Sequence, residues 1–282
     1  MKTNMKLLKT LMKMKQDELY NTLKRYISEK YEVTVIRNKF IIGVGDIPIG
    51  LIAHLDTVHK FPPTTFFFDR DNNVLWSPDG LGADDRAGVY AIIQIIEAGY
   101  RPHVIFCKDE EKGGIGAQEL ILSFPDCPFE NLKCLIELDR SGKNDCVFYD
   151  CDNKVFNKYI ESFGFKTDEG SFSDICIIAP TWQVAAVNLS IGYYEEHSFA
   201  EFLCITYLSE TIEKVKKILD AEPAMNNYLY VPRLYRNYKK SKCIFCDKIL
   251  QKNEGLHFYS NDMRLSYDCC PSCYSANYDL LV

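Results

Sequence analysis

The stretch HVIFCKDEEKGG, residues 103–114, joins an apolar run to a turn that holds three adjacent acids and two glycines. The first five residues are typical of a buried strand, and a helix over about 114–124 is expected to follow. Neighbouring carboxylates at the end of a strand repel one another, so they are either solvated on a loop or gathered around a cation. This stretch therefore predicts a strand-turn-helix unit and leaves both interpretations of its acids open.

Strands alternate with helices on both sides of this unit. The expected strands lie within 32–44, on either side of Arg37-Asn38, and at 49–53, 133–137, 147–149 and 184–189, with a hairpin around 71–73. The expected helices cover about 85–98, 153–163 and 198–219. Such alternation predicts an α/β fold whose mixed, mainly parallel sheet carries helices on both faces. Functional sites in these sheets gather where the strands end.

The domain organisation follows from length and from a change in composition near residue 220. A chain of 282 residues is long enough for one large domain and a small appendage. We expect a main domain over 1–220, which opens with an amphipathic N-terminal helix within 1–30. A linker over 221–242 and a cysteine-rich unit over 243–282 complete the expected organisation.

Charge and apolar runs restrict the partners of the chain. The net charge of −6 argues against nucleic acid as the main partner of the whole chain, although a local basic patch remains open. Lysines at 2, 6, 9, 13 and 15 interrupt every apolar run near the N-terminus, which fits neither a signal peptide nor a membrane anchor. No run of 18 apolar residues occurs, so we expect a cytoplasmic protein without a membrane partner. In that setting the 12 cysteines favour thiols and metal sites over disulfides.

Five segments place acids or histidines at probable strand ends or at turns into helices. In an extended strand His54 and Asp56 share one face, so the aspartate could hold the imidazole while the other ring nitrogen binds a metal. Each segment alone has an ordinary interpretation, such as a polar contact, a helix cap or a solvated loop. Together they indicate one shared metal site. The segments are AHLDTV (53–58), GLGADDRAG (80–88), KDEEKGG (108–114), IELDRSG (136–142) and YYEEH (193–197).

This series of motifs resembles the co-catalytic zinc exopeptidase superfamily, which includes peptidase T and the zinc aminopeptidases. The resemblance covers roughly residues 31–219. It implies a bridging role for Asp84 between two zinc ions, and a turn at Asp85 that follows this ligand. It further implies the remaining metal ligands, which are His54 and Asp139 for one ion and Glu111 and His197 for the other.

The resemblance also implies two catalytic roles. Asp56 would orient His54, and Glu110 would be the general base that passes a proton from water to the leaving amine. Carboxylates and imidazoles suit Zn²⁺ with an open position for chemistry, and Co²⁺ or Mn²⁺ would also fit such ligands. The expected reaction is cleavage of an amide bond in a small peptide-like substrate, most simply by an aminopeptidase. Two alternatives stay open: a deacylase or amidase acting on an N-acyl amino acid, and a scaffold without catalysis.

One departure from the superfamily concerns the lid. Relatives such as peptidase T and the aminoacylases insert a lid or dimerisation domain between the fourth and fifth ligand segments. Here the 57 residues 140–196 fit only elements of the main sheet, so no lid domain is expected. The loop 170–174 and Tyr193 or Tyr194 are candidates for substrate contact, and a polar loop and core aromatics are the equally good alternatives.

The C-terminal region contains two C-x-x-C pairs, Cys243 with Cys246 and Cys270 with Cys273. Their spacing predicts a zinc ribbon in which four thiolates hold one structural Zn²⁺. Cys269 competes for the third position, but only Cys270 preserves the C-x-x-C spacing. A ribbon of this kind could bind protein or nucleic acid, and the basic residues just before it are either a nucleic-acid contact or a solvated linker. They are Arg233, Arg236, Lys239, Lys240 and Lys242.

Overall fold

The computed structural model describes residues 3–233, 242–248, 250, 256–260, 265–270 and 273. The chain divides into two compact units, Met1–Arg233 and Leu234–Val282. Three of the basic residues before the ribbon, Arg236, Lys239 and Lys240, lie outside the described residues. Among the described residues, no helix combines the length and the apolar character that a membrane crossing requires.

An eight-stranded sheet forms the centre of the first unit, in the order β1-β2-β6-β3-β7-β10-β8-β9. The four central strands run parallel, and β1, β2 and β8 join through antiparallel pairs. The mixed, mainly parallel sheet expected from the sequence is thus confirmed. The strands are β1 (Val33–Ile36), β2 (Phe40–Val44), β3 (Ile47–His54), β6 (Pro102–Cys107), β7 (Cys134–Arg140), β8 (Asp145–Val147), β9 (Lys166–Thr167) and β10 (Ala186–Ser190).

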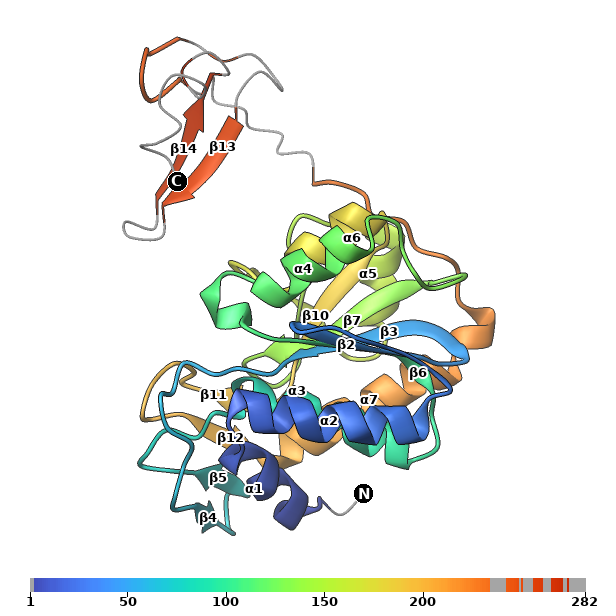
Figure 1. Ribbon diagram of the computed structural model, residues 1–282, viewed down its shortest axis with the longest axis vertical. Helices are drawn as coiled ribbons and strands as arrows, with labels where there is room; N and C mark the ends of the chain where they lie inside the picture. The colour runs from blue at the N-terminus through green and yellow to red at the C-terminus, as the bar shows by residue number, and fades with distance from the viewer. Residues whose placement is uncertain are drawn as a thin grey trace. The chain divides into compact units, whose positions relative to one another are not determined.

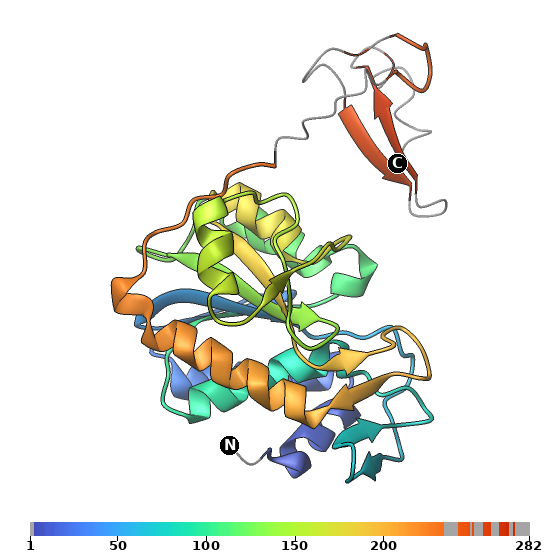
Figure 2. The same ribbon diagram turned by 180° about the vertical axis from the view of Figure 1, so that it is seen from behind.

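Helices cover both faces of this sheet (Figures 1 and 2). One face carries α2 (Gln16–Lys30), α3 (Ala83–Glu97) and α7 (Ile205–Asp220), with α1 (Met5–Lys13) packed on α3. The other face carries α4 (Ile115–Ser123) and α6 (Ile175–Trp182), while α5 (Lys154–Glu161) lies beside β9. The single N-terminal helix expected within 1–30 is two helices, because Met14 and Lys15 have extended backbone angles.

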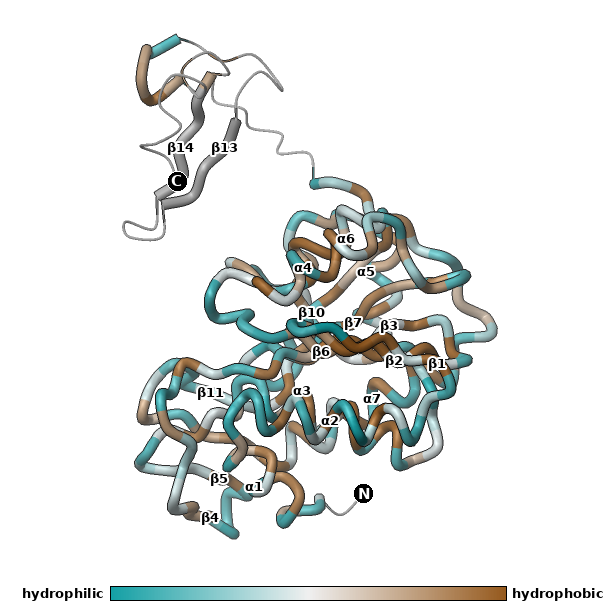
Figure 3. The backbone as a smooth tube through the Cα atoms, in the orientation of Figure 1, coloured by the Kyte–Doolittle hydropathy of each residue, from teal (hydrophilic) through white to brown (hydrophobic). Residues whose placement is uncertain are grey.

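The alternation of side chains along the central strands separates two apolar cores. In β3, Leu51 and Ala53 belong to the core under α2 and α3, whereas Ile52 belongs to the core under α4 and α6. Successive strand residues point to opposite faces, and both faces of this sheet are covered, so the strand reads as a continuous apolar run. Figure 3 shows this hydrophobic centre. Each fully buried aliphatic side chain contributes roughly 1.5–3 kcal/mol.

A second sheet of four strands, in the order β11-β12-β5-β4, was predicted only at its hairpin. That hairpin pairs β4 (Phe67–Asp69) with β5 (Val74–Trp76) around the expected turn. The long helix expected from about 198 begins at Ile205, because β12 (Phe202–Cys204) pairs with β5 and with β11 (Tyr193–Tyr194). Phe202 stacks on Tyr194 with ring centroids 5.1 Å apart, which favours the extended pairing over a longer helix.

Residues after α7 continue along the first unit instead of leaving it. A short 3₁₀ helix, η2 (Glu222–Ala224), follows α7, and Met225 and Tyr228 are buried. Leu229 bridges to Val184 and Pro232 bridges to Cys151. The sequence placed these residues in a linker, but the described part of that segment, up to Arg233, packs on the main unit.

The described residues of the second unit include an antiparallel pair of strands, β13 (Leu256–Ser260) and β14 (Leu265–Cys269). Cys243, Leu250 and Cys270 form a small buried cluster in it, with Cys273 packed alongside.

Candidate metal centre at the strand ends

The predicted acids and histidines meet at the carboxyl ends of the central strands. His54 is the last residue of β3, Glu110 and Glu111 follow β6, and Asp139 lies near the end of β7. Parallel neighbours end at the same edge of a sheet, which brings these side chains together although they are far apart in the sequence. His197 reaches the same place from the segment between β11 and β12.

Asp84 lies between the two histidines. Its Oδ1 is 3.0 Å from Nε2 of His54, and its Oδ2 is 3.1 Å from Nε2 of His197. A carboxylate that presents one oxygen to each imidazole has the arrangement needed to bridge two metal ions. Asp84 is 7% exposed, so this bridge is largely shielded from water.

Each histidine has a second acidic neighbour. Oδ1 of Asp139 is 3.3 Å from Nε2 of His54, and Oε1 of Glu111 is 3.0 Å from Nε2 of His197. Donor atoms also gather within 4.8 Å of one another in three overlapping groups. These are His54 with Asp85 and Asp139, Asp84 with Glu111 and His197, and His54 with Glu110 and Glu111.

The chemistry of this donor set fits zinc. Two imidazoles and three carboxylates converge, and buried carboxylates at such distances need positive charge among them. Burial, together with the nearby Asp84 carboxylate, raises the pKa of Asp139 well above its usual range. A divalent cation would stabilise the ionised form of all three acids. Sequence reasoning had assigned these five residues as ligands, and the structure places them together.

Asp56 connects His54 to the acidic turn after β6. Its Oδ1 lies 3.3 Å from Nδ1 of His54, the ring nitrogen that faces away from Asp84. The same carboxylate accepts the backbone N–H groups of Glu110, at 2.9 Å, and Glu111, at 3.2 Å. Asp56 thus fixes the His54 ring and the turn relative to each other, as residues around metal ligands commonly do.

Glu110 is an acid of the centre that forms no ion pair with the imidazole of His54 or His197. Its side chain is buried, with 8% of the residue exposed. Burial, together with repulsion from Glu137 and Glu111, raises the pKa of Glu110 to about 7. Such a carboxyl can both accept and donate a proton near neutral pH.

Asp85 has a different role from Asp84, although the two are adjacent and joined by a cis peptide bond. Its Oδ2 accepts the N–H of His54 at 3.2 Å, and its Oδ1 accepts the N–H of Gly88 at 2.8 Å. A Cβ at Gly88 would lie 2.2 Å from the Leu138 carbonyl oxygen, so only glycine permits this close approach of α3 to β7. Asp85 therefore holds the start of α3 against the strands.

Of the candidates for substrate contact, Tyr193 contacts the metal centre, whereas Tyr194 and part of the loop 170–174 contact other residues. The Tyr193 hydroxyl donates to Oδ1 of Asp139 at 3.2 Å and is buried, whereas Tyr194 stacks on Phe202. Within loop 170–174, Ser173 and Asp174 are fully buried, and the Ser173 hydroxyl donates to Glu137. These two loop residues therefore face the protein interior.

Glu201 is a residue of the site that sequence reasoning missed. It is 1% exposed, and its Oε2 accepts the N–H of Gly82 at 2.6 Å while its Oε1 accepts the N–H of Asp84 at 2.9 Å. His59 Nε2 lies 3.1 Å from the same Oε2. Glu201 thus holds the turn that carries Asp84. The only sequence signal was an acid directly before an apolar strand, which by itself does not predict burial.

The four cysteines of the second unit form a separate metal group. Sulfur atoms of Cys243, Cys246, Cys270 and Cys273 all lie within 4.8 Å of one another. Hydrogen bonds from backbone N–H groups, first that of Cys270, lower the pKa of Cys243 to about 6, which favours its thiolate. Four clustered thiolates suit a closed tetrahedral Zn²⁺ site, as a zinc ribbon requires. The side chain of Cys269 lies outside the described residues.

No protein-family model and no curated protein sequence matches the chain. Solved structures do match its fold. Aminopeptidase PepT from Bacillus cereus ATCC 10987 has a TM-score of 0.61 at 14% identity and covers 77% of this chain and 97% of that one. A tripeptidase from Staphylococcus aureus has a TM-score of 0.59 at 14% identity, and the match covers 77% of this chain and 97% of that one. A TET aminopeptidase from a marine sediment archaeon of the Thaumarchaeota has a TM-score of 0.60 at 14% identity, and the match covers 76% of this chain and 96% of that one.

These likenesses define the class to which the fold belongs. The first unit has the fold of the zinc aminopeptidases, with a candidate metal centre at its strand ends. Residues 140–196 form only the last residue of β7 and then β8, α5, β9, α6, β10 and β11, so no lid domain interrupts the sheet between Asp139 and His197.

Proposed function

We propose that this protein is a two-metal hydrolase that cleaves an amide bond in small peptide-like substrates, most simply as an aminopeptidase. The observation that carries the proposal is the position of Asp84, whose two oxygens each face a different imidazole at 3.0 and 3.1 Å. A purely structural carboxylate would need only one such partner. The aminopeptidases and the tripeptidase with the same fold support the substrate class.

The ligand roles follow from the contacts. His54 and Asp139 would hold one ion, His197 and Glu111 would hold the other, and Asp84 would bind both. When bound, two Zn²⁺ ions would polarise the scissile carbonyl and favour ionisation of the attacking water, and Co²⁺ or Mn²⁺ could serve in the same site. Separately, the four cysteines of the second unit would hold one structural Zn²⁺.

Glu110 supplies the proton transfer in this proposal. Its carboxylate takes a proton from the attacking water and gives it to the amine nitrogen that leaves, so the acid returns to its starting state. Asp56 supports this step, because it binds the Glu110 N–H and the His54 ring at once. Burial of Glu110 limits exchange of that proton with solvent.

The test compares blocked and unblocked substrates. The full chain, loaded in turn with zinc, cobalt and manganese, is assayed against short peptides with a free amino end and against the same peptides carrying an N-acetyl group. An aminopeptidase hydrolyses the first set, whereas a deacylase releases acetate from the second. His54→Ala is the control for contaminating activity. If neither set is cleaved faster than by His54→Ala, the hydrolase proposal is wrong and the scaffold alternative stands.

A further inference from the structure

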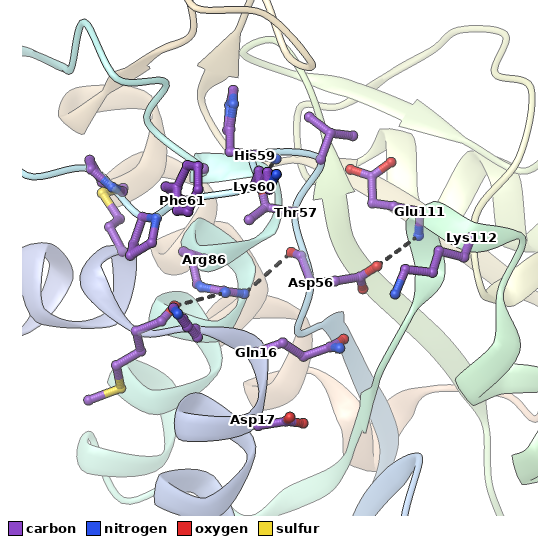
Figure 4. Close-up of a pocket in the computed structure, with 17 residues that line it drawn as sticks. Gln16, Asp17, Asp56, Thr57, His59, Lys60, Phe61, Arg86, Glu111 and Lys112 are labelled. Carbon is purple, nitrogen blue, oxygen red and sulfur yellow. Dashed lines mark hydrogen bonds between the residues drawn. The ribbon is translucent and has the colours of Figure 1, made fainter.

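A pocket of about 510 Å³ borders the candidate metal centre. Asp56 and Glu111 line both the pocket and the centre, and the other walls come from the junction of α1 and α2 and from the loop 57–63. Figure 4 shows Asp56 linked by hydrogen bonds to Arg86 on one side and to Glu111 on the other. A pocket of this volume accepts a ligand of a few residues.

Four permanent cations line this pocket: Lys15, Lys60, Arg86 and Lys112. Only Lys112 pairs with a carboxylate, that of Asp109 at 2.8 Å. Lys15 and Lys60 form no ion pair with any residue that the structure describes. The Nζ of Lys60 lies 5.5 Å from the centre of the Phe61 ring, a contact that leaves its charge uncompensated.

Arg86 is the buried cation of the pocket, with 2% of the residue exposed. Its guanidinium donates to the carbonyl oxygens of Leu55, of Asp56 at 3.3 Å and of Met14 at 3.2 Å. Its Nε has no hydrogen-bond partner among the described residues. A guanidinium stays protonated; its hydrogen-bond acceptors here are neutral carbonyl oxygens, and the carboxylates of Asp56, Asp85 and Asp84 are near enough to stabilise its charge.

The acids that line the pocket are already engaged elsewhere. Asp17 pairs with Lys108 at 2.6 Å, Asp56 faces His54, and Glu111 faces His197. The pocket thus has an excess of positive charge next to a centre rich in carboxylates. An anionic group of the substrate is therefore attracted to this pocket, which lies beside the proposed metal centre.

We infer that this pocket binds a carboxylate of the substrate, with Lys15, Lys60 and Arg86 as its counter-charges. The inference rests on the proposed function, since it places the scissile bond at the adjacent metal centre. Apolar side chains at Met12, Met14 and Phe61 line the same pocket and contact the rest of the ligand. The carboxylate comes either from the free end of a short peptide or from an acidic side chain.

The experiment uses three peptides and two charge-matched double variants of the full chain. The peptides are Leu-Gly-Gly with a free carboxylate, its carboxamide, and Leu-Gly-Glu carboxamide, which carries its charge on the side chain. Lys15→Gln with Lys60→Gln removes two pocket charges. Lys6→Gln with Lys24→Gln removes two exposed lysines of α1 and α2 outside the pocket, and is the control.

For the zinc-loaded protein, we expect kcat/KM at least about tenfold higher for a carboxylate peptide than for the uncharged carboxamide, the effect of a few charged contacts. The pocket variant should lose most of that ratio while cleaving the carboxamide normally, and the control should keep it. The ratio should also fall in 0.5 M salt, because these lysines are exposed and screened. The peptide that shows the higher ratio identifies the source of the carboxylate.

Cleavage of all three peptides at equal rates would overturn the pocket inference and leave the hydrolase proposal standing. If no peptide is cleaved, binding of the same peptides to the zinc-loaded Glu110→Gln chain tests the pocket inference separately from the hydrolase proposal. The pocket inference is supported if the carboxylate peptides bind more tightly than the carboxamide and if this difference is lost when Lys15→Gln and Lys60→Gln are added. In that case only the hydrolase proposal fails. Equal or undetectable binding of all three overturns the pocket inference.

Discussion

At the scale of single residues, the adjacent acids Glu110 and Glu111 illustrate how one turn can supply two functions. Oε1 of Glu111 lies 3.0 Å from His197 Nε2. Glu110 is buried, and this burial raises the pKa of its carboxyl group. Both backbone N–H groups bind Asp56, which fixes the turn that carries the two side chains. In the proposed mechanism, Glu111 binds a metal and Glu110 carries a proton.

Substitution of each acid by its amide separates the two roles. Glu110→Gln should keep both catalytic metals and reduce kcat by roughly 10²–10⁴-fold, because the proton acceptor is gone. Glu111→Gln should instead weaken one metal, seen as a lower zinc content after dialysis. Steady-state kinetics and metal analysis of both purified variants test this. An unchanged kcat for Glu110→Gln with every cleaved substrate would show that another group is the base.

At the scale of elements, two segments far apart in the sequence meet at Asp84. The first turn of α3 carries Asp84, the proposed bridging ligand, and Glu201, just before β12, accepts the N–H groups of Gly82 and Asp84. The strand β12 pairs with β5, which fixes Glu201 in place. Correct placement of Asp84 thus depends on the small second sheet as well as on the main one.

Glu201→Gln tests this dependence with little change in shape. The neutral amide keeps one oxygen acceptor but loses the charge and one of the two N–H contacts. We expect zinc affinity at the catalytic centre to fall by roughly tenfold, since loss of groups around ligands typically has this effect. Glu210→Gln, a change on the exposed surface of α7, is the matched control. The zinc affinities are measured by competition with a chelator. Equal affinities for both variants would show that Glu201 contributes to folding and not to zinc binding.

The sequence predicted the helices and strands correctly where the local pattern of apolar residues determines the secondary structure. The apolar runs at 49–53 and 103–107 are strands because both faces of the sheet are covered, and the ligand-bearing motifs fall at their ends. The second sheet was largely hidden, because β12 has three residues and its partner β5 is distant in sequence. Helix α6 was also missed, since Ile175–Trp182 is apolar on all sides and contains Pro180. Burial of Glu201 and Arg86 depends on tertiary contacts that no local pattern encodes.

At the scale of the whole molecule, the chain consists of two compact units, for which we expect different sources of stability. The first buries two apolar cores around its sheet, and its described part includes Met225 and Tyr228, which are 6% and 5% exposed. The ring centroid of Tyr228 lies 5.0 Å from that of Phe156. We expect the second unit to depend on its four cysteines, because binding Zn²⁺ to such sites contributes roughly 10–16 kcal/mol of apparent free energy.

Truncation tests where the first unit ends. The fragment 1–233 should fold, bind two catalytic metals and hydrolyse small substrates. The fragment 1–220 lacks Met225 and Tyr228, whose burial contributes roughly 1.5–3 kcal/mol each, so it should unfold at clearly lower denaturant concentration. Urea unfolding of both fragments followed by circular dichroism makes the comparison. Equal midpoints would show that residues 221–233 add nothing to the first unit.

The most direct test of the two-metal centre is the zinc content of the purified chain after dialysis, measured by elemental analysis. Three zinc ions per chain are expected, two at the strand ends and one at the cysteines. Asp84→Ala should reduce the content to one, because it removes the bridging ligand, while Cys243→Ser with Cys270→Ser should leave two. A single zinc ion per chain that persists in both Asp84→Ala and His54→Ala would contradict the two-metal centre.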